Sequence, residues 1–321
     1  CTAQTHNRNR DNNFPYRPDS SFYYLTGFKE PESVLVIIPG VRSHSIFFCQ
    51  KKNQEREIWT GKRYGPTRAL QELGFTKTYP VDKLGDVMPR LLAQKKVIYF
   101  HFGDDQRNQK FLSWVEAAYR TARGGAHPSI YDVEKLIGEM RVIKEPEEIE
   151  IMRRAAEISA EGHLRALRVC KPGMMEYELA AEVELVFRKH GGDPLHAYPS
   201  IVAGGENACT LHYVNNNCEL KDGDLVLIDA GCELECYASD ITRTFPVNGV
   251  FTQEQKALYE IVLKAQQAAI DEVRPGKSVI NPHRKAVGII TKGLTDLDIL
   301  KGDPRELIKK RAYFRFFMHS T

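Results

Sequence analysis

Short apolar runs alternate with helical patterns over the first part of the chain. The apolar runs have the length of β-strands and lie at residues 33–38, 44–49 and 96–100. Segments with proline and glycine separate them, and a helical pattern covers residues 105–123. Because such alternation is typical of a sheet covered by helices, we predict an amino-terminal α/β domain over residues 1–139.

Longer amphipathic patterns follow and predict a second domain over residues 140–321. Pro146 suits the first turn of a helix, and acidic residues follow it at the positive end of the helix dipole. A second amphipathic helix is predicted over residues 176–190, where a pair of glycines ends it. Thr252 is predicted to cap a third helix, which runs to about Val273.

Two aspartates lie in a pair of predicted strands between these helices. Residues 225–228 have the composition of a buried strand, and residues 237–245 form a second one. If the chain turns tightly at residues 234–235, Asp229 and Asp240 lie directly opposite each other across a hairpin. Their Cβ atoms would then be about 4.5–5.5 Å apart.

Two carboxylates held this close repel each other unless one is protonated or a cation lies between them. Apolar strands surround the pair, and an unpaired buried carboxylate is costly. The cation is therefore the favoured interpretation. The hairpin predicts a metal site in which two divalent ions share the carboxylates.

Composition and charge narrow the class of protein. The 321 residues carry 45 basic and 42 acidic side chains, so the net charge is +3. This balance gives no electrostatic reason to expect nucleic acid as a partner. No apolar run approaches the roughly 20 residues that span a bilayer, so no membrane partner is expected either. The odd count of seven cysteines favours reduced thiols and a cytoplasmic protein.

Several segments resemble, in order, the Xaa-Pro aminopeptidases, also called aminopeptidase P. They are 14–31 (FPYRPDSSFYYLTGFKEP), 141–149 (RVIKEPEEI), 204–213 (GGENACTLHY), 222–231 (DGDLVLIDAG), 237–249 (YASDITRTFPVNG) and 316–319 (FFMH). The resemblance covers nearly the whole chain. It implies that the second domain has the pita-bread fold, which this family shares with methionine aminopeptidase, prolidase and creatinase.

The resemblance also implies a dinuclear metallopeptidase that releases the first residue of peptides with proline in second position. The family binds two manganese ions through two Asp, one His and two Glu side chains, and Asp229 and Asp240 match the two Asp. The expected cofactors are therefore two divalent ions, with Mn²⁺ favoured by oxygen-rich ligands. A hydroxide that bridges the ions would attack the amide carbon before proline.

The remaining metal ligands are expected beyond Thr321. His319 matches a family histidine that comes four residues before the His ligand, and the two Glu ligands lie further on. The catalytic domain is therefore predicted to be incomplete in this chain. No signal peptide is visible, although a chain that begins at Cys1 rather than Met can have lost targeting information.

Further site residues follow from the same resemblance. His212 matches a family histidine near the substrate, and His319 is likewise a candidate for contact with the substrate. From the sequence itself, Thr242 and Arg243 follow Asp240 and are candidates to support it as a ligand. Trp59 matches a segment that approaches the active site of a neighbouring subunit. The residues alone also fit a satisfied strand-end histidine, a surface ion pair for Arg243 and a packing role for Trp59. Three other histidines are expected to be structural or at the surface: His163, His196 and His283.

Two other functions fit the same features. A prolidase would cleave only Xaa-Pro dipeptides, and a non-catalytic pita-bread module would bind peptides or protein partners. Retention of both aspartates favours an enzyme over the binding module, whereas the choice between aminopeptidase and prolidase depends on how the carboxyl end of the substrate is enclosed. The family resemblance further implies a homodimer or homotetramer that assembles through the amino-terminal domain.

Overall fold

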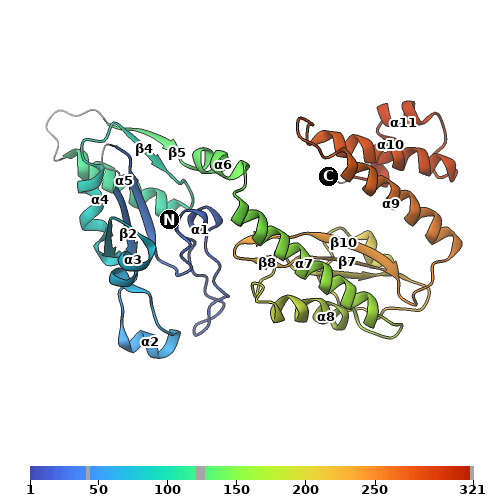
Figure 1. Ribbon diagram of the computed structural model, residues 1–321, viewed down its shortest axis with the longest axis horizontal. Coiled ribbons are helices and arrows are strands. Elements are labelled where there is room, and N and C mark those ends of the chain that lie inside the picture. Colours follow the sequence, from blue (N-terminus) through green and yellow to red (C-terminus); the bar gives the residue numbers. More distant parts are fainter. Residues whose placement is uncertain (41–43, 121–126, 319–321) are drawn as a thin grey trace. The chain divides into compact units, whose positions relative to one another are not determined.

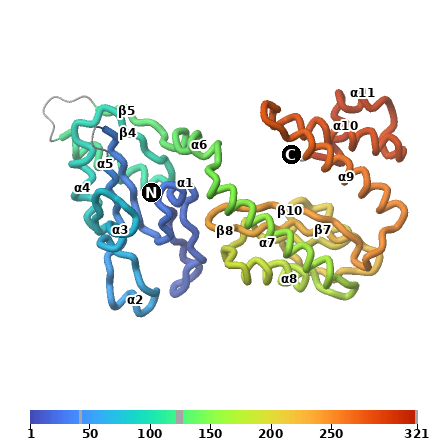
Figure 2. Tube along the Cα trace, viewed as in Figure 1, coloured from blue at the N-terminus to red at the C-terminus, as the bar shows by residue number. Residues whose placement is uncertain are grey.

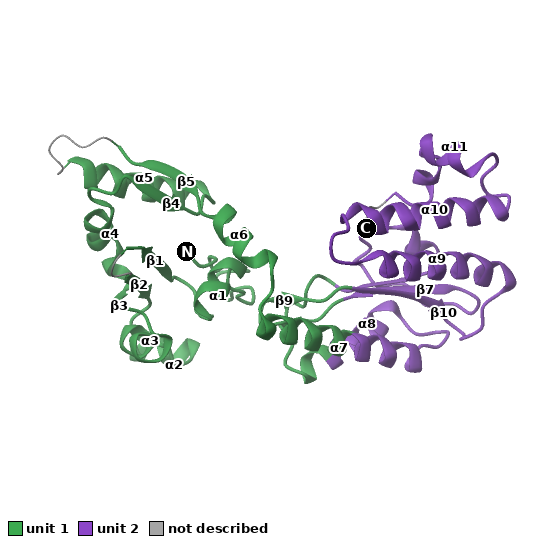
Figure 3. Cartoon of the chain, turned by 45° about the horizontal axis from the view of Figure 1, so that its top comes forward, with its two compact units in different colours: residues 1–159, 187–199, 231–240 green, residues 160–186, 200–230, 241–321 purple. Residues whose placement is uncertain are grey.

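The computed structural model describes residues 1–40, 44–120 and 127–318. His319 therefore lies outside the described residues. Contacts divide the chain into two compact units (Figure 3). Unit 1 comprises residues 1–159, 187–199 and 231–240, and unit 2 comprises residues 160–186, 200–230 and 241–321.

Unit 1 begins with an α/β arrangement, as the alternating pattern predicts (Figure 1). Within the described part of residues 1–139, the strands form two sheets rather than one. In the first, β2 (His44–Cys49) pairs with antiparallel β1 (Val34–Ile38) and parallel β3 (Lys77–Pro80). In the second, β4 (Val97–Phe100) pairs with parallel β5 (Ser129–Asp132). The helices between them are α1 (Ser20–Thr26), α2 (Gln54–Thr60), α3 (Gly65–Leu73), α4 (Leu84–Leu92), α5 (Asp105–Arg120) and α6 (Glu134–Val142), with a short turn η1 (Val81–Lys83).

Strand β2 is buried on both faces and organises the core of this region. Ile46 and Phe48 pack with residues of α4 and α5 on one face, while Phe47 packs with residues of α1 and α3 on the other. Successive side chains of a strand point to opposite faces. The continuous apolar run in the sequence therefore places one helix layer on each side of β2.

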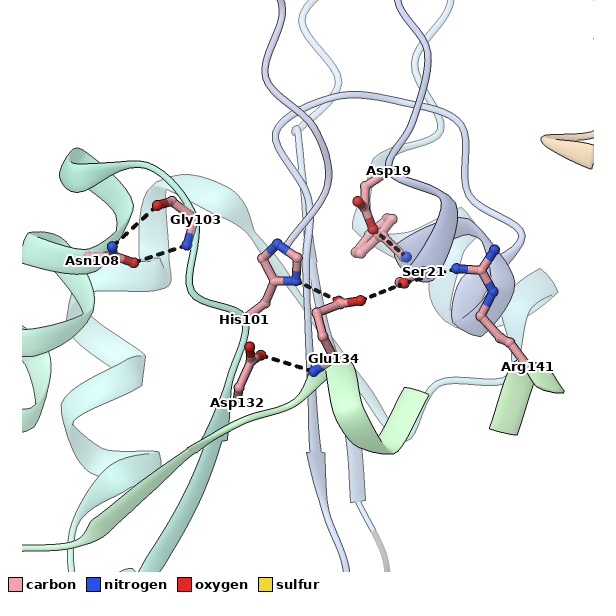
Figure 4. Close-up of polar contacts among 9 residues, drawn as sticks. Asp19, Ser21, His101, Gly103, Asn108, Asp132, Glu134 and Arg141 are labelled. Carbon is pink, nitrogen blue, oxygen red and sulfur yellow. Dashed lines mark hydrogen bonds and ion pairs between the residues drawn. The ribbon is translucent and has the colours of Figure 1, made fainter. Parts of the chain in front are cut away.

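A polar cluster connects the end of β4 to the helices α1 and α6 (Figure 4). The Glu134 carboxylate lies 2.6 Å from His101 Nδ1 and accepts a hydrogen bond from Ser21 Oγ at 3.3 Å. Arg141 donates to the same Ser21 hydroxyl at 3.2 Å, and Asp132 accepts from the Glu134 N–H at 3.0 Å. The cluster fixes the start of α6, the last helix before the second predicted domain.

Helix α7 (Pro146–Val169) begins at the predicted proline and contributes residues to both units. Unit 2 contains the antiparallel sheet β10 (Ile241–Pro246), β7 (Leu225–Ala230) and β6 (Ile201–Gly204), in that order. Figure 3 shows α8 (Glu176–Lys189) on one side of β7 and β10, and α9 (Gln253–Glu272) with α10 (Ile280–Asp296) on the other. Figure 2 follows the chain on to α11 (Pro304–Lys309); the short turns are η2 (Gly205–Cys209) and η3 (Ala312–Arg315).

The helix ends follow the local signals in the sequence. Thr252 caps α9 as predicted, because its side chain accepts from the Gln255 N–H while the Gln255 side chain accepts from the Thr252 N–H. The second predicted helix is confirmed as α8, one residue shorter than expected at its end. These signals act within a few residues and do not depend on tertiary packing.

The hairpin between the two aspartates has a different register from the predicted one. The short strands β8 (Glu233–Leu234) and β9 (Tyr237–Ala238) pair Leu234 with Tyr237, so that the two turn residues are 235 and 236. In the sheet of unit 2, Asp229 pairs with Thr242. The prediction that Asp229 and Asp240 lie directly opposite each other is therefore wrong, because the turn comes one residue later than expected. When the turn moves by one residue, the partner of each strand residue moves by two. Every side chain therefore stays on its expected face of the sheet.

The hairpin is fixed to α7 by two buried serines. Ser159 Oγ accepts from the Cys232 N–H at 2.7 Å, so its own proton is available to Ser239 Oγ at 2.7 Å. Ser239 Oγ then donates to the Cys232 carbonyl oxygen at 2.8 Å and also lies 3.2 Å from the Ala155 carbonyl oxygen. Because a hydroxyl has one proton, this assignment uses both donors and leaves neither serine unpaired.

Gly231 allows a close approach of the two hairpin strands. A Cβ atom at this position would lie 1.8 Å from the carbonyl oxygen of Ser239, a backbone atom, and 3.2 Å from the Tyr198 ring. No side chain larger than hydrogen fits there without movement of the backbone. The requirement for glycine at 231 is thus one of space.

We expect Gly231→Ala to destabilise unit 1 by about 3 kcal/mol, since the added methyl group displaces backbone atoms. Gly138→Ala in α6 is the matched control, because a Cβ atom there meets nothing within 4 Å. Alanine is favoured over glycine inside a helix by about 1 kcal/mol, so the control should be neutral or more stable. Urea unfolding of both variants measures the difference, and equal midpoints would contradict the close approach.

Candidate metal centre and its surroundings

Asp229 lies on the central strand of the sheet in unit 2. Its neighbours across the ladder are Ile201 on β6 and Thr242 on β10. Burial alternates along β7: Val226 and Ile228 are fully buried, whereas Asp229 is half-buried. The pleat therefore turns the Asp229 carboxylate to the face opposite the apolar core.

Asp240 lies in unit 1, directly after Ser239 of the buried serine network. Its side chain is exposed, and Oδ1 accepts a hydrogen bond from the Tyr198 hydroxyl at 3.0 Å. Tyr198 was not expected from the sequence, because a single tyrosine 42 positions away gives no periodic or motif signal. The bond orients the carboxylate of Asp240.

The two aspartates supply the type of donor atom that a hard divalent cation binds. Carboxylate oxygens are ligands that Mg²⁺ and Mn²⁺ prefer. Within residues 1–40, 44–120 and 127–318, no group of three or more His, Cys, Asp or Glu side chains is arranged to hold a metal ion. Two carboxylates alone supply fewer ligands than the roughly six that such ions take, so further ligands or water are needed.

A second contact attaches the hairpin to the start of α7. The Tyr237 hydroxyl donates to Glu148 Oε1, and the Glu145 N–H donates to Glu148 Oε2 at 2.8 Å. Glu148 is buried, and these two hydrogen bonds, that of Tyr237 first, lower the pKa of its carboxyl group. Tyr237 is thus a packing residue with a satisfied hydroxyl.

His212 lies in the turn after η2, and its side chain is exposed. The next residue, Tyr213, is half-buried, and its hydroxyl donates to Glu176 Oε2 at 2.8 Å. Tyr213 therefore packs with a satisfied hydroxyl. The expected role of His212 towards substrate stays a prediction.

Thr242 and Arg243 take different places around Asp229. Thr242 is exposed and directly opposite Asp229 in the ladder, whereas Arg243 is opposite Ile228. Because side chains alternate along a strand, Arg243 leaves the sheet on the face away from Asp229. Its guanidinium donates to the Thr242 carbonyl oxygen at 2.7 Å. Thr242 is therefore the better placed of the two to support a ligand.

The histidines expected to be structural make structural contacts. His163 on α7 is buried, with Nε2 lying 3.1 Å from the Ala230 carbonyl oxygen, and burial lowers the pKa of its imidazole. The His196 ring lies edge-on to Phe187 at 5.4 Å, and the His283 ring stacks on Phe317 at 5.5 Å.

Trp59 follows Ile58 on helix α2, and its side chain is 87% exposed. The packing interpretation of this tryptophan is therefore wrong for the chain by itself. Ile58 beside it is also exposed, and the adjacent apolar side chains are compatible with the predicted approach to a neighbouring subunit.

Comparison with known proteins gives the family. The model of "Metallopeptidase family M24" matches residues 150–321, and that of "Aminopeptidase P, N-terminal domain" matches residues 1–99. The chain belongs to metallopeptidase family M24. Both matches confirm the predicted fold class: an α/β amino-terminal domain followed by a pita-bread domain. They also confirm the prediction of a hydrolase that cleaves peptides.

Individual relatives agree with the family match. The chain is 42% identical to an Xaa-Pro aminopeptidase of Escherichia coli, over 97% of this chain and 72% of that protein. Among solved structures, an aminopeptidase PepP of Pseudomonas aeruginosa has a TM-score of 0.94 and 45% identity, over 98% of this chain and 72% of the other. A proline aminopeptidase P II of Yersinia pestis has a TM-score of 0.95 and 43% identity, over 99% and 74%. Within the described residues, every helix is too short or too polar to cross a membrane.

The Glu148 carboxylate should make the stability of unit 1 depend on pH. Its folded pKa is lowered, so its stabilising effect is present above the unfolded value near 4.5 and is lost as pH falls through the folded value. We expect Glu148→Gln to cost about 2 kcal/mol at pH 7 and much less at pH 3. Chemical unfolding at the two pH values, with the exposed neighbour Glu147→Gln as control, measures this; an equal cost at both pH values would contradict it.

Proposed function

We propose that the protein is a metal-dependent aminopeptidase that releases the N-terminal residue from peptides with proline in second position. The observation that carries this proposal is the retention of Asp229 and Asp240 in a chain that resembles Xaa-Pro aminopeptidases along nearly its whole length. The amide bond before proline has no N–H group. Recognition would therefore depend on the substrate's carbonyl oxygen and free α-amine.

We propose Asp229 and Asp240 as ligands of two divalent ions, with Mn²⁺ preferred, and a His and two Glu ligands beyond Thr321. When bound, such ions supply Lewis acidity and a water of lowered pKa for amide hydrolysis. A cytoplasmic location remains part of the proposal and rests on the cysteine usage.

The described residues have distinct tasks in this proposal. Tyr198 holds one oxygen of Asp240 and so limits the rotation of that carboxylate. Thr242, across the ladder from Asp229, lies where it can support the second carboxylate. The exposed side chain of His212 is available to donate a hydrogen bond to the carbonyl oxygen of the scissile amide as negative charge develops there.

Replacement of Asp229 by Asn tests the metal proposal. We expect release of the first residue from an Xaa-Pro-Xaa tripeptide to fall by at least about 100-fold, with weaker Mn²⁺ binding by calorimetry, because an anionic ligand is lost. Asp296→Asn is the control, since this exposed carboxylate pairs only with a lysine on its own helix in the contacts described. Wild-type activity on Xaa-Pro dipeptides but not on tripeptides would favour prolidase, and equal Mn²⁺ affinity of both variants would contradict the ligand assignment.

We further propose that the protein forms a homodimer or homotetramer in which Trp59 approaches the substrate of a neighbouring subunit. Trp59→Ala should raise KM by about 10-fold with little change in kcat, because binding contacts are lost while the metal site is untouched. Gln54→Ala, at an exposed polar position of the same helix, is the control. Sedimentation velocity gives the oligomeric state, and a monomer with unchanged KM in the variant would contradict the proposal.

A further inference from the structure

The loop between β6 and β7 carries His212 and is held at both ends by one buried carboxylate. Glu176 is the first residue of α8, and its side chain is fully buried. The loop leaves β6 at Gly204, and its segment around Cys218 returns to run beside the start of α8. All of these residues belong to unit 2.

Glu176 accepts four hydrogen bonds, two on each oxygen. Oε1 accepts from the Gly204 N–H at 2.8 Å and from Asn207 Nδ2 at 2.9 Å. Oε2 accepts from the Tyr213 hydroxyl at 2.8 Å and from the Cys218 N–H at 2.9 Å. One oxygen thus holds the outgoing part of the loop and the other holds the returning part.

The energetics favour an ionised carboxylate at this position. Burial by itself raises the pKa of Glu176, but the four donors outweigh it and the pKa is lowered overall. The carboxylate also lies in the first turn of α8, where the helix dipole favours negative charge. The donors offset the cost of burying this charge, and loss of one partner would leave the buried carboxylate incompletely compensated.

The place of His212 follows from these bonds. Residues 208–212 lie between the two side chains that reach Glu176, those of Asn207 and Tyr213, and the histidine directly precedes Tyr213. Asn216 adds a further anchor, because its side chain accepts from the Val202 N–H at 2.9 Å and donates to the Ser200 carbonyl oxygen at 2.8 Å. The exposed His212 therefore extends from a segment with buried, polar attachments on both sides.

We propose that Glu176 is a positioning residue that sets the location of His212 for the reaction. The carboxylate is closed off from solvent and its oxygens are taken by the loop, so it acts through the loop and does not touch substrate. This inference rests on the proposed function for its effect on catalysis. Its effect on the loop can be measured without substrate.

Glu176→Gln is the decisive variant, since it keeps the shape of the side chain and removes the charge. The Tyr213 hydroxyl can turn to accept from the new amide group, but the Cys218 N–H then loses its acceptor. We expect faster hydrogen exchange in peptides covering residues 204–218 and a fall in kcat of about 10- to 100-fold with KM changed far less. Glu178→Gln is the matched control, because this exposed carboxylate in the same turn accepts from the Met175 N–H and not from the loop.

A double-mutant cycle with His212→Ala separates positioning from a general loss of structure. If Glu176 acts through His212, Glu176→Gln should cost little further activity in the His212→Ala background. An equal cost in both backgrounds, or unchanged exchange of the loop, would overturn the proposal. Should Glu176→Gln not fold, Tyr213→Phe removes a single donor and should change exchange in the same direction.

The exchange and activity measurements also separate this inference from the proposed function. If the wild-type protein with Mn²⁺ shows no peptidase activity while Glu176→Gln loosens the loop, the proposed function fails and the loop attachment stands. If activity is present but neither exchange nor the cycle responds to Glu176→Gln, the positioning inference fails and the proposed function stands.

Discussion

The buried contact of Ser159 with Ser239 is the constraint on which the arrangement around Asp240 depends. It joins α7 to a hairpin in which the Gly231 backbone approaches the Ser239 carbonyl oxygen too closely for any Cβ atom. Asp229 precedes Gly231 by two residues, and Asp240 directly follows Ser239. Each proposed ligand therefore lies within two residues of a closely packed segment whose serine hydroxyls are hydrogen-bonded. This packing restricts the movement of the ligand. Serine hydroxyls suit this place because they satisfy backbone groups at little cost in volume.

The sequence predicted those features whose causes are local. Pro146 at the start of α7 and Thr252 at the cap of α9 act on backbone groups within one helical turn, and both predictions hold. The hairpin register was mispredicted because its turn uses Glu235 and Cys236 with positive φ, which residues other than glycine seldom adopt. No Asn-Gly or Asp-Gly pair marks the turn, so its position is set by the contacts of the hairpin with α7.

The residues that sequence reasoning missed act at long range. Tyr198, Ser159 and Glu176 reach partners 28 to 80 positions away, and no local pattern in the sequence identifies those partners. The family resemblance marks residues for which chemistry is proposed, such as Asp229 and His212. The side chains that hold them in place become visible only when the fold brings distant segments together.

Carboxylates in this chain differ in their exposure to solvent and in the number of hydrogen bonds that they accept from the protein. Glu176 is closed to solvent and accepts four hydrogen bonds, whereas Asp240 is exposed and Asp229 is half-buried. The apolar packing of β7 explains why the Asp229 carboxylate is the more accessible kind. Val226, Ile228 and Ala230 occupy the core, and the two-residue period of the strand then forces Asp229 to the other face. A slip of one residue would bury the charge and expose the core, so the same hydrophobic burial that stabilises the sheet keeps this carboxylate accessible to a cation.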